Sequence, residues 1–364
     1  MTEQNLTNNT ETSTKDWLAY LVTQGAILEN DTVISFGNTE SELAATNNSA
    51  IICDLSHLGL IEIDGADAVT FLQGQVTNDV KLLDGSVSHY TGYCSPKGRL
   101  LALFLAFSHY NHLHLQFSHE LVAPIMKRLK MYVMRSKVEI KDATTSIIKI
   151  GLSSEDAVFL LESLFSKVPK NHYELVSLSN GALICLPSGK TKPRYEIFTS
   201  SEHALVIWNT LKQHCSPVGK NCWDLLEIEA GIPEIVTATQ EEFVPQMLNL
   251  DLMDAINFKK GCYTGQEIVA RTHYLGKVKR RTLHAEIDSH VLPKAGDNVL
   301  NDTKEVIGKV VRSALNQHGK ISLLIEVRLD NVDLTQLENT KLTLNEVNIK
   351  WLDENYTMLL PSAI

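Results

Sequence analysis

Apolar and polar positions follow two different patterns along most of the chain. Short runs rich in Val, Ile, Leu and aromatic residues, bounded by Gly, Asn or Asp, predict strands, whereas apolar residues spaced three or four apart predict helices. Several strands are joined by short turns, which favours antiparallel or mixed α+β layers over a doubly wound parallel sheet. The predicted strands span residues 51–55, 58–63, 87–94, 100–107, 112–117, 137–140, 147–151, 182–186 and 195–199, and the predicted helices span residues 66–73, 119–131, 155–165 and 203–214.

The pattern changes near Val278, where the helical spacing stops. Short apolar runs separated by Gly, Asn and Asp turns predict strands at residues 282–287, 298–300, 305–313, 321–327, 340–344 and 347–351. A series of short strands without an intervening helix indicates an all-β terminal domain, either a small barrel or a Greek key.

The N-terminal part carries weaker signals. Residues 1–13 are rich in Asn and Thr and have little apolar surface to bury, so we expect them to be disordered. Ser13 and Thr14 are candidate caps for a helix that carries apolar residues between Trp17 and Val22. Residues 37–49 form a polar break before the first predicted strand of the main pattern.

Composition narrows the class of protein. A length of 364 residues predicts two or three domains. The net charge of −10 argues against a large nucleic-acid surface but leaves room for a local basic pocket. Six cysteines without a Cys-x-x-Cys pair indicate a reduced, intracellular protein. The N-terminus shows no signal-peptide pattern, and the longest apolar run, Leu100–Phe107, is too short to cross a bilayer, so we expect a cytoplasmic protein.

The most informative segment is residues 258–271, Phe-Lys-Lys-Gly-Cys-Tyr-Thr-Gly-Gln-Glu-Ile-Val-Ala-Arg. Thr264 and Glu267 have the spacing of a capping box, which predicts a helix with Thr264 as its N-cap. Cys262 would then lie two residues before the positive end of that helix. Lys259, Lys260 and Arg271 add positive charge, and such surroundings favour a thiolate that acts as a nucleophile or metal ligand. The alternative is that a tight glycine turn leads into an ordinary surface helix and that Cys262 is only a small side chain that fills space.

This segment resembles the signature of the YgfZ family, which comprises folate-binding relatives of the glycine-cleavage T-protein that act in iron–sulfur protein maturation. Residues 61–67, 71–79 and 129–142 resemble the first lobe of the same superfamily, so the resemblance covers roughly residues 45–280. It implies an α+β, T-protein (GcvT)-like fold, in which interlocked ferredoxin-like lobes surround a central folate pocket and a C-terminal β-barrel follows.

The resemblance also suggests where the domains begin and end. We expect an N-terminal tail and extra helix over residues 1–45 and a first, folate-binding α+β lobe over residues 46–145. A second α+β lobe over residues 146–277 would carry the Cys262 segment, and residues 278–364 would form the barrel.

The resemblance implies tetrahydrofolate as the cofactor and several residues that contact it. Trp223 matches a position implicated in folate binding, and Glu229 matches a carboxylate that contacts the pterin in T-protein relatives. A second family tryptophan aligns with Leu58, which removes one stacking surface. On sequence alone, a core tryptophan is the favoured interpretation of Trp223, and a glutamate at a solvated helix end is the favoured interpretation of Glu229.

Other candidate contacts come from two short segments. Lys97 and Arg99 lie in a basic turn that resembles a family turn and could hold the glutamate tail of a folate by charge-assisted hydrogen bonds. The alternative interpretation of this turn is a solvent-facing hairpin. Tyr263 is a further cofactor-binding candidate, and Gln73 and Gln75 could add polar contacts. Lys260, Gln266 and Arg271 are expected to support Cys262 as the functional thiol.

The chain departs from aminomethyltransferases at one position that matters chemically. In those enzymes, the strand after the basic turn carries an aspartate pair, whereas residues 100–105 here are Leu-Leu-Ala-Leu-Phe-Leu. Because leucine or alanine cannot replace a carboxylate that orients or protonates the folate nitrogen, aminomethyl transfer is not expected.

The resemblance therefore implies a tetrahydrofolate-binding protein that supports assembly or repair of iron–sulfur clusters and, indirectly, tRNA modification by thiolation. Its partners would be iron–sulfur assembly factors or client iron–sulfur enzymes, with no direct nucleic-acid or membrane contact. A folate-dependent one-carbon transferase and a folate-independent interaction scaffold are the alternatives. No firm metal site is predicted: His112 and His114 lack a third ligand with suitable spacing, and Cys262 is a possible transient cluster ligand.

Overall fold

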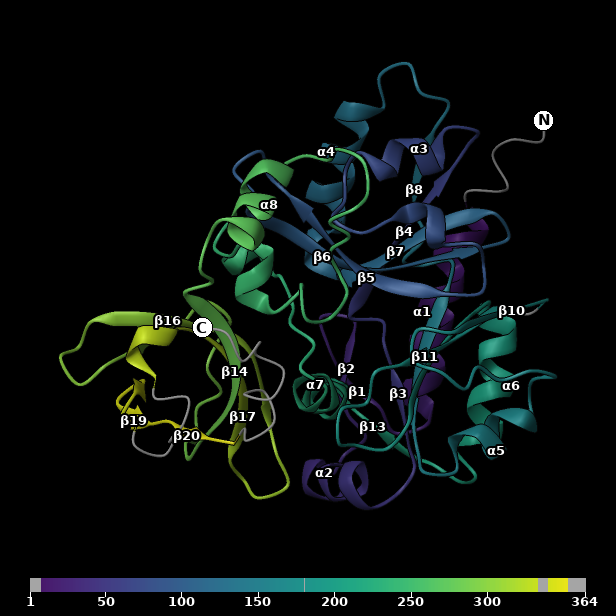
Figure 1. The fold of residues 1–364 in the computed structure, drawn as a ribbon. Coiled ribbons are helices and arrows are strands. Elements are labelled where there is room, and N and C mark those ends of the chain that lie inside the picture. The colour runs from purple at the N-terminus through teal and green to yellow at the C-terminus, as the bar shows by residue number, and fades with distance from the viewer. Residues whose placement is uncertain (1–7, 180, 333–339, 353–364) are drawn as a thin grey trace. The chain divides into compact units, whose positions relative to one another are not determined.

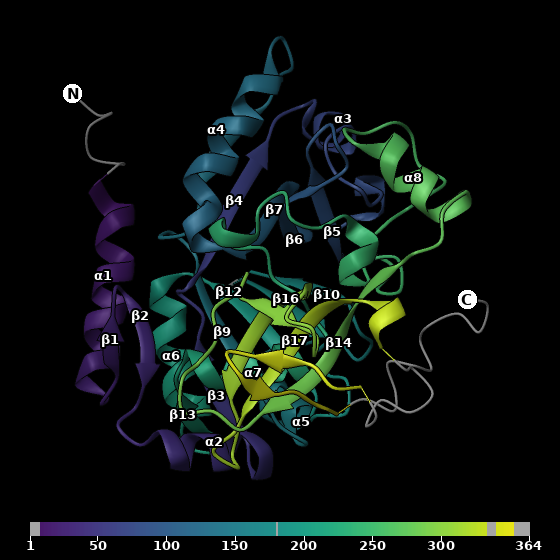
Figure 2. The same ribbon diagram turned by 90° about the vertical axis from the view of Figure 1, so that its left-hand side faces the viewer.

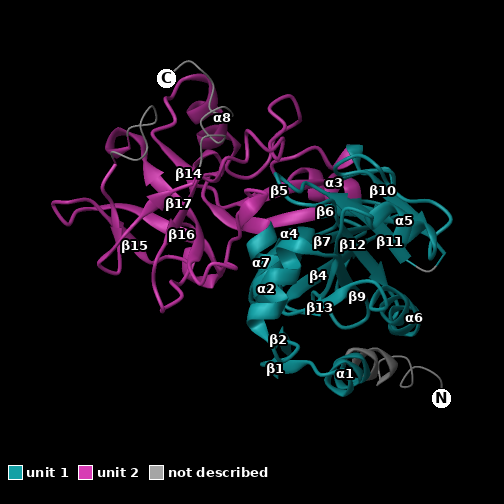
Figure 3. Ribbon diagram, turned by 90° about the horizontal axis from the view of Figure 1, so that it is seen from below, with its two compact units in different colours: residues 1–68, 82–88, 106–226 teal, residues 69–81, 89–105, 227–364 magenta. Residues whose placement is uncertain are grey.

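A computed structural model describes residues 8–179, 181–332 and 340–352 of the chain. The chain forms two compact units that are interleaved in sequence (Figure 3). The first unit comprises residues 1–68, 82–88 and 106–226, and the second comprises residues 69–81, 89–105 and 227–364. The division between them passes through strands β5 (Ser88–Cys94) and β6 (Leu100–His109).

A six-stranded sheet in the order β10-β11-β12-β9-β3-β13 organises one half of the first unit. Neighbouring strands are antiparallel except for the parallel pair β13–β3. The core against this sheet includes Trp17 of helix α1 (Asn8–Thr23) and Trp208 of helix α6 (Ser201–Leu211), whose rings meet edge to face. The strands are β3 (Ile51–Asp54), β9 (Ile148–Ser153), β10 (Leu175–Leu178), β11 (Gly181–Leu186), β12 (Arg194–Thr199) and β13 (Ser216–Val218).

Short elements complete the first unit around this sheet. Helix α6 begins where the Ser200 hydroxyl accepts a hydrogen bond from the His203 amide, and α2 begins where the Asn38 side chain accepts from the Ser41 amide. These elements are β1 (Ile27–Glu29), β2 (Thr32–Ser35), α2 (Thr39–Asn48), α5 (Ala157–Glu162) and α7 (Lys220–Glu229), the last of which continues into the second unit.

The second sheet has five strands in the order β5-β6-β7-β4-β8. Strand β4 (Leu58–Asp64) pairs antiparallel with β7 (His112–Ser118) and with β8 (Glu139–Asp142). Helix α4 (Val122–Val133) lies along β4 and packs on it and on β8 (Figure 2). It buries Val122, Ile125 and Leu129, whose spacing of three and four residues places them on one helix face. Helix α3 (Ala68–Gln73) follows β4.

The second unit ends in a seven-stranded, nearly closed barrel with the strand order β19-β18-β15-β16-β17-β14-β20. Its core contains Leu283, Val310, Leu323 and Ile325 from the central strands, which lie side by side in Figure 1. A register shift between Val310 and Arg312 is a bulge of the kind that curves a sheet toward closure. The strands are β14 (Arg280–Ile287), β15 (Asn298–Leu300), β16 (Val306–Leu315), β17 (Ile321–Arg328), β18 (Thr343–Leu344), β19 (Val347–Asn348) and β20 (Lys350–Trp351).

The structure confirms the antiparallel α+β layers and the terminal barrel, and it corrects three local expectations. Residues 39–48 of the predicted polar break form helix α2, because the Asn38 cap and the buried Leu43 outweigh a polar sequence. Helix α1 begins at Asn8, inside the segment expected to be disordered, while residues 1–7 lie outside the described residues. Short strands β1, β2, β10 and β13 were not predicted. The domain boundaries at residues 45, 145 and 277 stay a prediction.

Within residues 8–179, 181–332 and 340–352, no helix is both long enough and apolar enough to span a membrane.

Arg281 and Asp251 form a buried ion pair in the second unit, and the stability of that unit should depend on it. Arg281 donates to both carboxylate oxygens of Asp251, at 2.5 and 2.9 Å, and also to the Gln246 carbonyl. Both side chains are less than 10% exposed. Asp251→Asn leaves the guanidinium buried with a weaker partner, so we expect the free energy of unfolding to fall by about 3–5 kcal/mol in urea titrations.

The matched control is Asp330→Asn, which affects an exposed pair with Arg328 at 3.9 Å. That change should alter the free energy of unfolding by less than about 0.5 kcal/mol. Equal effects of the two substitutions would show that the buried pair carries no special share of the stability.

Candidate functional site

The segment that carries Cys262 is a loop followed by helix α8 (Gln266–Tyr274). The predicted capping box is not formed: the N-cap is Gly265, with φ at 85° and no side-chain cap bond. Thr264 is therefore not the N-cap, and its amide lies 3.4 Å from the Gly74 carbonyl. Cys262 lies three residues before the N-cap rather than two.

Close packing explains why glycine occupies the start of the helix. A Cβ atom on Gly265 would lie 2.5 Å from the Ser95 carbonyl oxygen and 2.9 Å from the Gly98 Cα. A Cβ on Gly98 would in turn lie 2.7 Å from the Ile268 side chain. Both glycines also have positive φ, a backbone conformation that residues with side chains rarely adopt. The two backbones can approach each other this closely because neither residue has a side chain. This contact sets the basic turn at residues 95–99 against the first turn of α8.

Cys262 differs from the other five cysteines in its exposure. All six fall within the described residues, and Cys262 alone among them is exposed. Burial raises the pKa of the Cys94, Cys215 and Cys222 thiols to about 12. Burial also raises the pKa of Cys53 and of Cys185. Cys262 is therefore the thiol that a reagent or partner can reach.

Lys260 holds the cysteine loop in place. Its ammonium donates hydrogen bonds of 2.7 Å to the carbonyls of Val76 and Asn78, and it lies 5.3 Å from the centre of the Tyr263 ring. Burial lowers the pKa of Lys260 to about 8, an effect that Asp79 partly offsets. Burial also raises the pKa of Tyr263.

Further bonds fasten the same two segments together. The Asn257 amide donates to the Thr77 carbonyl, the Thr77 hydroxyl donates to the Ala255 carbonyl, and the Asn78 side chain donates to the Asp254 carbonyl. Thr77 and Asn78 are buried, and sequence patterns gave no role for them because their partners lie nearly 180 residues away along the chain.

The candidate cationic residues differ in their availability. Lys97 is exposed at the tip of its turn, whereas the Arg99 guanidinium donates to the Glu242 carbonyl and is half-buried. Lys259 and Arg271 are exposed, and Gln266 is partly exposed in the first turn of α8. The structure thus brings the Lys97 turn, the segment at residues 74–78 and the Cys262 loop together within the second unit.

Glu229 belongs to the second unit, and its carboxylate lies 3.7 Å from Nε2 of His284. Gln73 donates to Asp79 and accepts from the Val80 amide, so both ends of its side-chain amide are engaged. The side-chain oxygen of Gln75 is buried without a hydrogen-bond partner.

Trp223 and Leu58 belong to the first unit, and both are buried. The indole of Trp223 packs so closely on Gly151 that a Cβ there would lie 2.5 Å from the ring, and the Arg194 guanidinium lies 5.4 Å from the ring centre. Its Nε1 is buried without a hydrogen-bond partner. The indole therefore offers a hydrogen-bond donor rather than an exposed stacking face.

Strand β6 carries no acid over residues 100–105. Residues 100–105 are all buried apolar side chains within the strand. The two histidines on β7 face Glu62: His112 lies at 3.4 Å and His114 at 3.6 Å from its carboxylate. Among the described residues, no group of three or more His, Cys, Asp or Glu side chains could hold a metal ion.

Comparisons with known proteins place this geometry in a family. The GCVT N-terminal domain matches residues 31–260. The chain is 36% identical over 230 residues to the tRNA-modifying protein YgfZ of Colwellia psychrerythraea (strain 34H), which covers 63% of this chain and 69% of that protein. It is 29% identical over 259 residues to the tRNA-modifying protein YgfZ of Yersinia pseudotuberculosis serotype IB (strain PB1/+), covering 71% and 77% of the two chains.

A solved structure shares the fold over almost the whole chain. The crystal structure of the glycine cleavage system aminomethyltransferase T from Bartonella henselae superposes with a TM-score of 0.70, covering 93% of this chain and 96% of that one at 15% identity. This likeness confirms the T-protein-like fold. Together with the domain match and the identity to the Colwellia protein, it shows that this chain belongs to the YgfZ family of proteins with a GCVT N-terminal domain.

Proposed function

We propose that this protein binds tetrahydrofolate and supports assembly or repair of iron–sulfur clusters, and so affects tRNA modification indirectly. The observation that carries the proposal is the single exposed cysteine, Cys262, on a loop fastened by Lys260 beside a basic turn. The name shared by the relatives, tRNA-modifying protein, supports the link to tRNA.

Cys262 has the chemistry that such a role needs. A thiolate is a soft ligand for the iron of a cluster handled as cargo, and it is also a nucleophile toward an electrophilic carbon. The exposed side chains of Lys259 and Arg271 add positive charge along the same segment. Lys260 acts differently, because its ammonium is committed to two backbone carbonyls and positions the loop.

Several residues fit a folate. The unpartnered N–H of Trp223 would donate to an acceptor on the ligand, and Glu229 would accept from the amino group and ring nitrogen of the pterin. Lys97 is exposed and suits the carboxylates of a glutamate tail. Arg99 fits less well, because its guanidinium already donates to Glu242. Leu58 would supply apolar contact alone.

Two other functions are less well supported. Aminomethyl transfer, the activity for which the similar Bartonella protein is named, would need a carboxylate where β6 has buried leucines. A scaffold that binds no folate would assign no role to the Trp223 N–H, which has no hydrogen-bond partner in the protein. We propose that the partners are iron–sulfur assembly factors or client enzymes.

Alkylation tests the accessibility of Cys262. With substoichiometric iodoacetamide at neutral pH, we expect Cys262 to be modified first and the other five cysteines to stay largely unmodified until the protein unfolds. The reason is that the five are buried, and burial raises the pKa of each. Peptide mass spectrometry measures the order, and early labelling of Cys222 or Cys94 would contradict the prediction.

Complementation tests the role of the thiol. Cys262→Ser nearly preserves volume and should leave the urea unfolding midpoint and folate binding unchanged. It should abolish support of cluster-dependent tRNA thiolation in cells that lack the native protein, measured as thiolated nucleoside content. Lys294→Gln, an exposed lysine elsewhere in the second unit, is the control and should complement fully. Full complementation by Cys262→Ser would remove the thiol from the mechanism.

Calorimetry with tetrahydrofolate tests the ligand. Trp223→Phe keeps an aromatic ring but removes the N–H, so binding should weaken by about 0.5–1.5 kcal/mol, the net value of one hydrogen bond. Alanine is unsuitable here because removing a buried aromatic ring typically costs about 3–5 kcal/mol of stability.

Lys97→Gln should weaken binding by up to about 1 kcal/mol, as expected for an exposed ion pair, and by less in high salt. The matched control is again Lys294→Gln, which should bind as the wild type does. Unchanged affinity in both Trp223→Phe and Lys97→Gln would place the folate site elsewhere, without bearing on the role of Cys262.

A further inference from the structure

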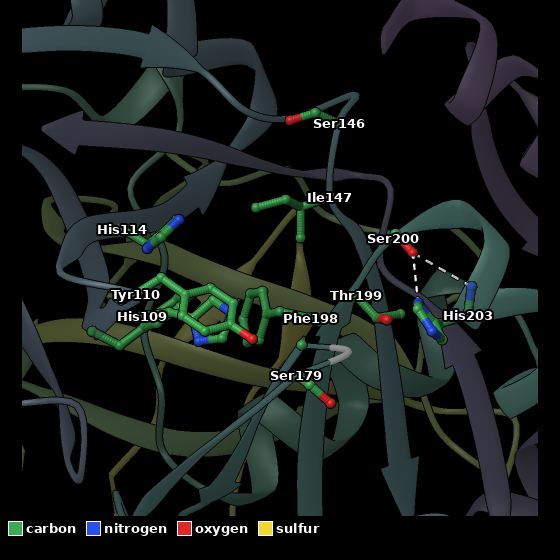
Figure 4. Close-up of a pocket in the computed structure, with 12 residues that line it drawn as sticks. His109, Tyr110, His114, Ser146, Ile147, Ser179, Phe198, Thr199, Ser200 and His203 are labelled. Atoms are coloured by element: carbon green, nitrogen blue, oxygen red, sulfur yellow. Dashed lines mark hydrogen bonds between the residues drawn. The ribbon is translucent and has the colours of Figure 1, made fainter. Parts of the chain in front are cut away.

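A pocket lies within the first unit, and the residues that line it include none of those proposed to bind folate. Its volume is about 330 Å³, and it is formed where the ends of β6, β7, β11 and β12 meet the start of α6 (Figure 4). That volume is within the size range of small-molecule sites in proteins. Neither Cys262, Trp223 nor the Lys97 turn lines it.

One wall of the pocket is a fixed hairpin. Strands β6 and β7 are joined by the two residues Tyr110 and Asn111, with φ of 49° and 66°, the backbone of a type I′ turn. The Tyr110 hydroxyl donates 2.8 Å to the Leu178 carbonyl, and the His109 ring bonds Ser177 at 2.8 Å. Tyr110 is 61% exposed, yet these two bonds hold its ring at the edge of the pocket.

The buried side chain of His114 presents an unpaired nitrogen there. The residue is 3% exposed, and its ring stacks on Phe107 with centroids 5.0 Å apart. Its Nε2 lies 3.6 Å from Glu62, whereas its Nδ1 is buried with no hydrogen-bond partner. Interaction with His114 lowers the pKa of Glu62 to about 2, so this carboxylate is ionised and holds the proton on Nε2. In the neutral imidazole, Nδ1 is then an acceptor without a donor.

The rest of the lining indicates what kind of molecule fits. Among the described residues, the lining contains no Lys, Arg, Asp or Glu, and burial lowers the pKa of His109 to about 4, so this ring is neutral at neutral pH. Phe107, Tyr110 and Phe198 supply aromatic surface, and Ser146, Ser179 and Ser200 supply hydroxyls. Figure 4 shows Ser200 and His203 across the pocket from His114. An anion would find no cation to pair with, while a neutral flat ring would find both ring faces and hydrogen-bond partners.

We propose that this pocket binds a neutral heteroaromatic ring of nucleobase size that donates an N–H hydrogen bond to Nδ1 of His114. The N–H donor meets the one buried acceptor that the lining leaves unpaired, and the aromatic side chains cover the ring. This proposal does not depend on folate binding or on Cys262.

The test is calorimetric titration of the full-length protein with adenine and cytosine, and with caffeine as a purine that has no N–H donor. We expect saturable binding of at least one of the two bases and binding of caffeine at least tenfold weaker than adenine if adenine is the base bound. The ring protons of His114 and His109 should shift in the NMR spectrum on saturation. Absence of saturable binding by both bases, or shifts confined to other histidines, would overturn the proposal.

Substitutions of single residues test whether His114 and Tyr110 contact the base. His114→Phe keeps the stack on Phe107 and removes the acceptor, so affinity should fall about three- to tenfold, as expected for one hydrogen bond. Tyr110→Ala, at an exposed turn with little risk to folding, should also weaken binding. The matched control His112→Asn alters the neighbouring histidine of β7, which contacts Glu62 but does not line the pocket, and should bind as the wild type does.

A competition experiment separates this site from the proposed folate site. Protein saturated with tetrahydrofolate should bind the base with unchanged affinity. Competition between the two ligands, or unchanged binding in His114→Phe, would show that the base occupies another site and would overturn the proposal.

Discussion

The hydrogen-bonded, half-buried ammonium of Lys260 is the interaction on which the candidate site depends. A lysine side chain taken out of water is stable only where its donors are satisfied, and here two carbonyls and an aromatic face replace the solvent. The carbonyls belong to Val76 and Asn78, in a segment far from Lys260 in sequence. Because burial already lowers the pKa of Lys260 to about 8, the bonds offset a substantial desolvation cost. A guanidinium is larger and planar, and would not meet the same two oxygens.

This anchoring explains how an exposed thiol can also be well positioned. Cys262 lies between Lys260, which is fixed to residues 76–78, and Gly265, which is pressed against Gly98. A short loop held at both ends loses little further conformational entropy when a partner engages its central side chain. The other five cysteines are buried, so the fold presents one thiol at a defined place and protects the rest.

Much of this arrangement could be predicted from sequence, and the remainder has a clear physical origin. Short apolar runs bounded by turn residues predicted most strands of the two sheets and of the barrel, because these strands are largely buried. Helix α2 was missed because its stability comes from the Asn38 cap and a few buried contacts rather than from a long apolar stripe. The motif around Cys262 identified the segment, but the capping box was wrong, since local spacing cannot reveal that Gly98 needs a glycine opposite it. The pairing of Lys260 with residues 76–78 spans more than 180 residues and has no local signal.

The likeness to the Bartonella aminomethyltransferase concerns the fold and does not extend to the chemistry of particular side chains. The fold is shared over 93% of this chain at 15% identity, so most side chains differ. Strand β6 carries Leu-Leu-Ala-Leu-Phe-Leu at residues 100–105, and these side chains are buried. A carboxylate in that setting would need new partners to remain charged. The apolar side chains of β6 are part of the core, while the exposed thiol lies on the loop before α8. A shared fold here positions different chemistry, and function has to be argued from the thiol.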